Sequence, residues 1–132
     1  METKPLSSPT TQDDLLLAFD MAPVGLLISR NRYVQSCNRV FSNMFGYLSE
    51  ALKGKSLLSL YPSVTEFEHI GDRALMVMRN EGRYSDDRIM KRNNGQLFWC
   101  HVSGRPLTGT SRFLLQYGCL RIFQKKGKSR LN

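Results

Sequence analysis

The chain has 132 residues, of which 41% are hydrophobic and 23% are charged, a composition that predicts one globular domain with a hydrophobic core. No apolar run is long enough to span a membrane, and no basic flank with an apolar stretch opens the N-terminus. We therefore expect neither a membrane segment nor a secretory signal. Three cysteines far apart in sequence favour free thiols in a reducing cytoplasm.

The formal charge of +8 is unevenly distributed along the chain. Residues 121–132 contain five Lys and Arg and no acid, whereas residues 13–120 contain 13 Lys and Arg against 10 Asp and Glu. A basic tail is usually solvated, and no basic stripe interleaved with aromatic residues accompanies this one. Nucleic-acid binding by the tail is therefore the least favoured function.

The predicted elements begin after residues 1–12, which are rich in Ser, Thr and Pro and are expected to be disordered. Acids then open a helix that stops near Pro23, and two apolar runs separated by a turn read as strands. These three elements are predicted over residues 14–20, 24–29 and 33–37.

A run of helices is predicted next. Asn38 is a typical N-cap, and Gly46 a typical end, for the first of them. Two short helical turns are predicted over residues 49–54 and 56–61, before the longest helix over residues 64–81. Its apolar residues recur at helical spacing and form one stripe. The stripe consists of Phe67, Ile70, Ala74, Val77 and Met78.

The sequence Asn93-Asn94-Gly95 predicts a tight hairpin turn, because these residues tolerate positive φ. Side chains alternate across a strand, which places Phe98, Cys100 and Val102 on one face and Trp99 and His101 on the other. Cys100 and His101 thus point apart and cannot jointly bind a metal ion. We expect the face with Cys100 to pack inside the domain.

A last strand is predicted within residues 113–123, where more than one register is open. Two strands, a run of helices and then three strands imply an α+β fold, with helices packed over an antiparallel sheet.

Three stretches resemble a PAS domain, namely MAPVGLLIS, CNRVFSNMFGYLSEALKGKSL and NEGRYSDDRIMKRNNGQLFWCHVSGRPL. Residues 60–92 are most similar to PAS modules of bacterial LuxR-type transcriptional regulators. The resemblance implies a five-stranded antiparallel sheet in the order 2-1-5-4-3, covered by short helices and one long helix. We accordingly assign residues 1–12 to a disordered segment, 13–123 to a PAS domain and 124–132 to a basic tail.

The resemblance also implies a function without enzymatic activity. Such modules sense a signal in a cavity between sheet and helices and relay the change to a transcription or signalling effector, in this case from the cytoplasm. A small apolar or weakly polar molecule is the expected ligand. The alternative is a protein–protein interaction or dimerisation module, whose cavity is filled by its own side chains.

A homodimer is expected on separate grounds. The first helix carries Leu15, Leu16, Leu17 and Phe19, which is more apolar surface than a lone surface helix needs. Trp99, on the outward face of the hairpin, would complete the contact.

Ten residues are predicted to surround the ligand. Those of the helical layer are Phe41, Phe45, Ile70, Ala74 and Met78; those of the sheet are Met90, Phe98, Cys100 and Val102, with Arg88 near the mouth. Ala74 is the smallest of them and marks where space for a ligand is expected.

Arg88 has two interpretations, because it shares a strand face with Met90 and Asp86. Its guanidinium could bind a carboxylate or phosphate with two parallel hydrogen bonds. Alternatively it pairs with Asp86 or with an acid from the helices, or extends to solvent at the rim. We favour the second interpretation, since buried Arg is rare without a partner.

No cofactor, metal or catalytic group is predicted. His69 lies about two residues before the position of the haem-binding His in oxygen-sensing relatives, and two residues turn a helical side chain by about 200°. The reactive-cysteine motif of flavin-binding relatives is absent, and no Ser/His/Asp arrangement in a suitable context occurs.

Overall fold

The structure is a computed structural model that describes residues 8–107 and the backbone of residues 115–122. The helices are α1 (Gln12–Met21), α2 (Arg39–Phe45), α3 (Ser49–Leu52), the 3-10 helix η1 (Leu57–Leu60) and α4 (Val64–Glu81). The strands are β1 (Gly25–Arg30), β2 (Tyr33–Cys37), β3 (Tyr84–Lys91), β4 (Leu97–Pro106) and β5 (Leu115–Ile122). This element order agrees with the α+β fold predicted from the sequence.

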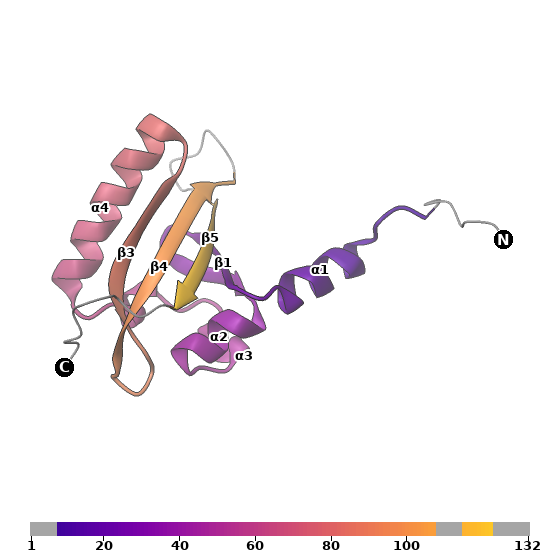
Figure 1. Cartoon of the computed structure of the whole chain (residues 1–132), viewed down its shortest axis with the longest axis horizontal. Coiled ribbons are helices and arrows are strands. Elements are labelled where there is room, and N and C mark those ends of the chain that lie inside the picture. The colour runs from indigo at the N-terminus through magenta and orange to yellow at the C-terminus, as the bar shows by residue number, and fades with distance from the viewer. Residues whose placement is uncertain (1–7, 108–114, 123–132) are drawn as a thin grey trace.

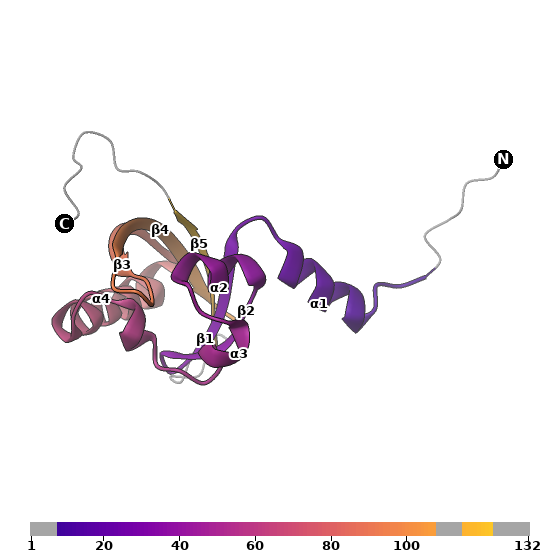
Figure 2. The ribbon, with the colours of Figure 1, turned by 90° about the horizontal axis from the view of Figure 1, so that it is seen from below.

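The strands form one antiparallel sheet in the order β2-β1-β5-β4-β3, with the last strand in its centre (Figure 1). β5 pairs Tyr117 with Ile28 of β1 and Leu120 with Val102 of β4, which defines the register that the sequence left open. Figure 2 shows the sheet curving, with α4 beside β3 and with α2 and α3 beside β1 and β2. α1 stands away from the body of the domain in both views.

Asn38 joins α1, β1 and α2. Its fully buried side chain accepts hydrogen bonds at Oδ1 from the backbone N–H groups of Leu26, at 2.9 Å, and Phe41, at 3.0 Å. Its Nδ2 donates to the carbonyls of Phe19, at 3.0 Å, and Val24, at 2.9 Å. The residue that the sequence identified as an N-cap therefore also fastens the end of α1 to the sheet.

The turn of the β3–β4 hairpin is held against the C-terminal end of α2. The backbone N–H of Asn93 donates to the carbonyl of Phe45 at 2.7 Å, and its side chain donates to that of Gly46 at 3.2 Å. Arg92 Nη1 donates to the carbonyl of Met44. These bonds satisfy carbonyl groups that a helix end leaves without partners, so helix α2 and the hairpin position one another.

The predicted faces of the hairpin are confirmed by burial. Phe98 and Cys100 are buried, whereas the His101 side chain is one-third exposed and contacts Asp87 on the neighbouring strand. His101 Nδ1 lies 2.7 Å from Asp87 Oδ1. Cys100 and His101 therefore do not form a shared chemical site.

The first helix begins earlier than predicted. Thr11 caps it, because its hydroxyl accepts from the N–H of Asp14 at 3.0 Å while the Asp14 carboxylate accepts from the N–H of Thr11 at 2.9 Å.

The predicted disordered segment falls partly on residues 1–7, and the basic tail wholly on residues 124–132, all of which lie outside the described residues. Across residues 8–107 and 115–122, none of the helices is both long and apolar enough to cross a membrane.

Candidate ligand site between the sheet and α4

A cavity of about 220 Å³ lies between the inner face of the sheet and the helical layer of α2, η1 and α4. Most of its described lining is apolar, and its polar lining includes Arg88, Tyr61 and Arg32. Seven of the ten residues predicted from the sequence line it: Phe41, Ile70, Ala74, Met78, Arg88, Met90 and Val102. The alternation of β3 and the stripe of α4 had indicated five of these seven residues.

Phe45, Phe98 and Cys100 were also expected along a ligand cavity, but they are not among the residues that line this one. All three are buried in the core instead. The ring of Phe45 lies 4.9 Å from that of Phe41 and 5.3 Å from that of Phe98, so aromatic rings fill the space between α2 and the hairpin. Strand alternation showed which side chains point inward, but not where along the strand the helices separate from the sheet.

Arg88 is buried, with only 7% of its surface exposed. Its Nε donates to Asp86 Oδ1 at 2.9 Å and its Nη1 donates to the hydroxyl of Tyr61 at 2.9 Å. The favoured pairing with Asp86 is thus confirmed, whereas the extension to solvent is not observed. Among the described residues, Nη2 of Arg88 is a buried nitrogen without a hydrogen-bond partner.

Asp86 is shared between several donors. Besides Arg88, its carboxylate accepts from Arg73 Nη2 at 2.8 Å and from the Tyr84 hydroxyl at 3.1 Å. Burial raises the pKa of Asp86, although the hydrogen bond and charge of Arg73 oppose that rise. Burial likewise lowers the pKa of Arg88. Both charges are therefore held in surroundings that solvate them poorly.

Arg32 and Tyr61 belong to the same polar group, and the sequence did not identify either. Arg32 comes from the β1–β2 turn, where it has φ 66°, an uncommon left-handed conformation for a side chain of this size. Its Nη1 donates to the carbonyl of Phe67 at 2.8 Å, and its guanidinium lies 3.6 Å from the Phe67 ring centroid. Its Nη2 lies 3.5 Å from the Tyr61 hydroxyl oxygen.

Gly71 of α4 allows this approach. A Cβ atom at position 71 would lie 2.2 Å from Nη1 of Arg32, closer than any real contact. A glycine within a long helix is the signal that sequence reasoning could have used, because such a residue usually has a packing or functional reason.

The described residues contain no group of three or more His, Cys, Asp and Glu side chains that would hold a metal ion. His69 is exposed on α4, as expected from its displaced position in the helix. Among the described residues, Cys37 is a free thiol.

Comparisons with known proteins agree with this architecture. A family profile described as "PAS domain" matches residues 23–119. The PAS domain of a LuxR-family transcriptional regulator from Burkholderia thailandensis, solved in complex with ethanol, is 43% identical. That match covers 85% of this chain and 99% of that one, with a TM-score of 0.80.

Two further proteins are similar. The sensor protein TdiS of Thauera aromatica is 30% identical over 111 residues, or 84% of this chain and 20% of that protein, so the chain spans about a fifth of its length. A PAS domain from Colwellia psychrerythraea shares the fold, with 18% identity and a TM-score of 0.76 over 84% of this chain and 95% of that one.

Proposed function

Because the chain belongs to the PAS domain family, we propose that it is a sensory module that binds a small molecule in the cavity between the sheet and α4. The cavity carries this proposal, since about 220 Å³ of space remains between the sheet and α4, whereas protein interiors are generally close-packed. Similarity to a LuxR-family regulator and to a sensor protein supports a relay to a transcription or signalling effector. PAS sensory domains are generally signalling modules without enzymatic activity.

A small ligand is also in keeping with the Burkholderia domain, which forms a complex with ethanol. The alternative function, an interaction module without a ligand, requires the cavity to be filled by its own side chains. Phe41, Met78 and Met90 are bulky enough for this, yet they line the cavity and leave it open. This observation favours sensing over the alternative. We assign the module to the cytoplasm as part of the same proposal.

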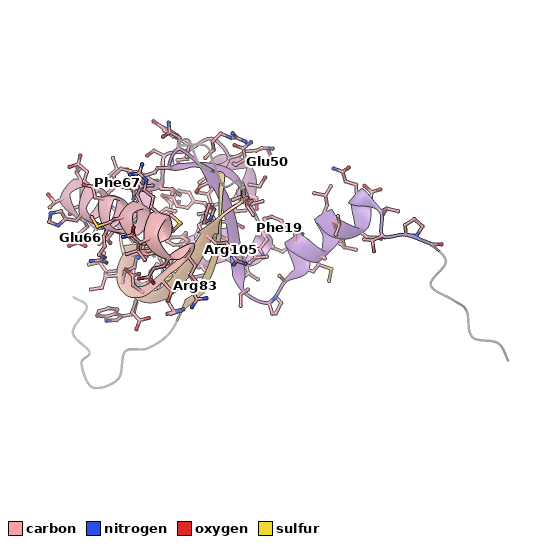
Figure 3. All side chains as sticks on the ribbon, turned by 90° about the horizontal axis from the view of Figure 1, so that it is seen from above. Phe19, Glu50, Glu66, Phe67, Arg83 and Arg105 are labelled. Atoms are coloured by element: carbon pink, nitrogen blue, oxygen red, sulfur yellow. The ribbon has the colours of Figure 1, made fainter. Side chains whose placement is uncertain are left out.

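The relay is proposed to pass through α1, which pairs with the α1 of a second copy. Leu15, Leu16, Leu17 and Met21 are between 58% and 65% exposed, and a lone helix of ten residues is marginally stable in water. Figure 3 shows the side chains of α1 standing clear of the body, with Phe19 at the end nearest the domain. Asn38 connects that end to Phe41, a cavity residue, so a ligand that moves α2 would also move α1.

Replacing Ala74 by Phe tests the binding of a ligand in the cavity. Native mass spectrometry of the freshly purified wild type is expected to show a bound small molecule, and Ala74→Phe should lose it because the larger side chain occupies the space. Overpacking typically costs about 1 to 3 kcal/mol, so circular dichroism must first confirm that the variant folds.

The matched control is Ala51→Phe, which adds the same ring at an exposed position of α3 and should keep the ligand. A folded Ala74→Phe protein that retains the bound molecule would contradict the proposed site. A wild type that carries no molecule and binds none from a library of small fragments would contradict ligand sensing altogether.

A further inference from the structure

The polar end of the cavity presents hydrogen-bond donors without matching acceptors. A guanidinium group can only donate, so the hydroxyl oxygen of Tyr61 accepts from Arg88 Nη1 at 2.9 Å and from Arg32 Nη2 at 3.5 Å. These bonds use both lone pairs of the oxygen, and the hydroxyl hydrogen remains free to donate. Arg88 Nη2 also keeps its hydrogens without a partner among the described residues. Two neighbouring donors on lining residues of the cavity are therefore left without an acceptor among the described residues.

The charge of the lining has the sign that such an acceptor needs. Arg32 and Arg88 line the cavity and, within the described part of the chain, no Asp or Glu does. Asp86 pairs with Arg88 but is shared with Arg73, so one carboxylate serves two guanidinium groups. Arg88 is more than nine-tenths buried, and a buried charge without full pairing is unfavourable. An anion in the cavity would complete the pairing.

The remaining lining limits the size and character of that anion. Leu27, Phe41, Ile70 and Met78 supply apolar surface for a hydrocarbon body. The volume of about 220 Å³ lies below the roughly 300 to 1,000 Å³ of sites for drug-sized ligands, so the molecule must be compact. A phosphate would bring more charge and more acceptor oxygens than two free donors can satisfy. A carboxylate has one charge and two oxygens.

We propose that the ligand of this cavity is a compact organic carboxylate, whose carboxylate group binds Arg88 and Tyr61 and whose hydrocarbon part lies against the apolar lining. The inference rests on the proposed function, because it names the chemical class of the molecule that the cavity senses. Arg32 has a positioning role, since it holds the Tyr61 hydroxyl through Nη2 and is itself held by the Phe67 carbonyl.

The test compares benzoate with benzamide, which has nearly the same shape but no charge. Both are titrated into the full chain and followed by nuclear magnetic resonance of the backbone amides. We expect benzoate to bind about 10-fold more tightly or better, since hydrogen bonds to charged groups are about twice as strong as neutral ones. Arg88→Met should weaken benzoate binding by about 10- to 100-fold and benzamide binding by less than about 3-fold.

Two further variants complete the design. Arg83→Met removes a charge at an exposed position between α4 and β3, labelled in Figure 3, and should leave benzoate binding unchanged. Tyr61→Phe keeps every charge and removes one donor, so it should weaken benzoate binding by about 3- to 10-fold. If Arg88→Met fails to fold, an unchanged benzoate affinity in Tyr61→Phe overturns the inference by itself.

The outcomes separate this inference from the proposed function. Equal affinities of benzoate and benzamide, both insensitive to Arg88→Met, would overturn the carboxylate but leave a small-molecule sensor. Binding of neutral fragments at Ala74 or Met78 without any binding of benzoate would likewise overturn the carboxylate alone. If no fragment of either kind binds, both the inference and the proposed function are rejected.

Discussion

Replacing Asn38 by Ala should destabilise the domain by about 3 to 5 kcal/mol. The side chain is fully buried and makes four hydrogen bonds of 2.9 to 3.0 Å. At a net contribution of about 1 kcal/mol each, their loss amounts to about 4 kcal/mol, of which the helix cap is about 1. The backbone N–H groups of Leu26 and Phe41 would be left without partners in a buried setting, which moves the cost toward the upper value.

Urea unfolding followed by far-UV circular dichroism measures this loss as a lower midpoint with an unchanged slope. The control is Asn43→Ala on the same helix, where the side chain is exposed and the change should stay within about 0.5 kcal/mol. Domains of this size are stable by about 5 to 15 kcal/mol, so the Asn38 variant should still fold at low urea. A loss below about 1 kcal/mol would refute the assignment of Asn38 as the connection between α1, β1 and α2.

Further predictions concern Cys37 and the first helix. Burial, together with the charge of Asp20, raises the pKa of Cys37 from 9.0 to about 11. At pH 8, iodoacetamide should therefore modify Cys37 about 10- to 100-fold more slowly in the folded chain than in the urea-unfolded chain. Equal modification rates, measured by peptide mass spectrometry, would contradict this. The folded state holds the Cys37 thiol proton more tightly than the unfolded state does, and this difference stabilises the fold below pH 9. The stabilisation is lost as pH rises from about 9 to about 11. Urea midpoints of the wild type that fall no more steeply over this range than those of Cys37→Ala would argue against it. Light scattering should give a dimer mass for the wild type and a monomer mass for Leu16→Glu, which places a charge on the exposed apolar surface of α1. The control Gln12→Glu, on the same helix, should remain a dimer. A wild-type monomer at high concentration would reject the dimer.

The sequence by itself determined the elements and the inward faces of this domain. Asn38 and Gly82 cap helices through groups within a few residues of them, so these capping roles can be read locally. The period of two in β3 likewise placed Arg88 and Met90 on the same buried face. The stripe on α4 placed Ala74 toward the sheet for the same kind of reason.

Only the tertiary structure decided which inward side chains border empty space and which fill it. Phe45 and Phe98 have the same pattern as cavity residues, yet their rings meet because the hairpin turn is held against the end of α2. The polar end of the cavity depends equally on distant segments. Tyr61 lies 27 positions from Arg88 and 29 from Arg32, and Gly71 leaves room beside α4 for the Arg32 guanidinium. Periodicity specifies the direction of a side chain within one element, whereas the free donors of this site arise from the distances between several elements, which the packing of the whole chain sets.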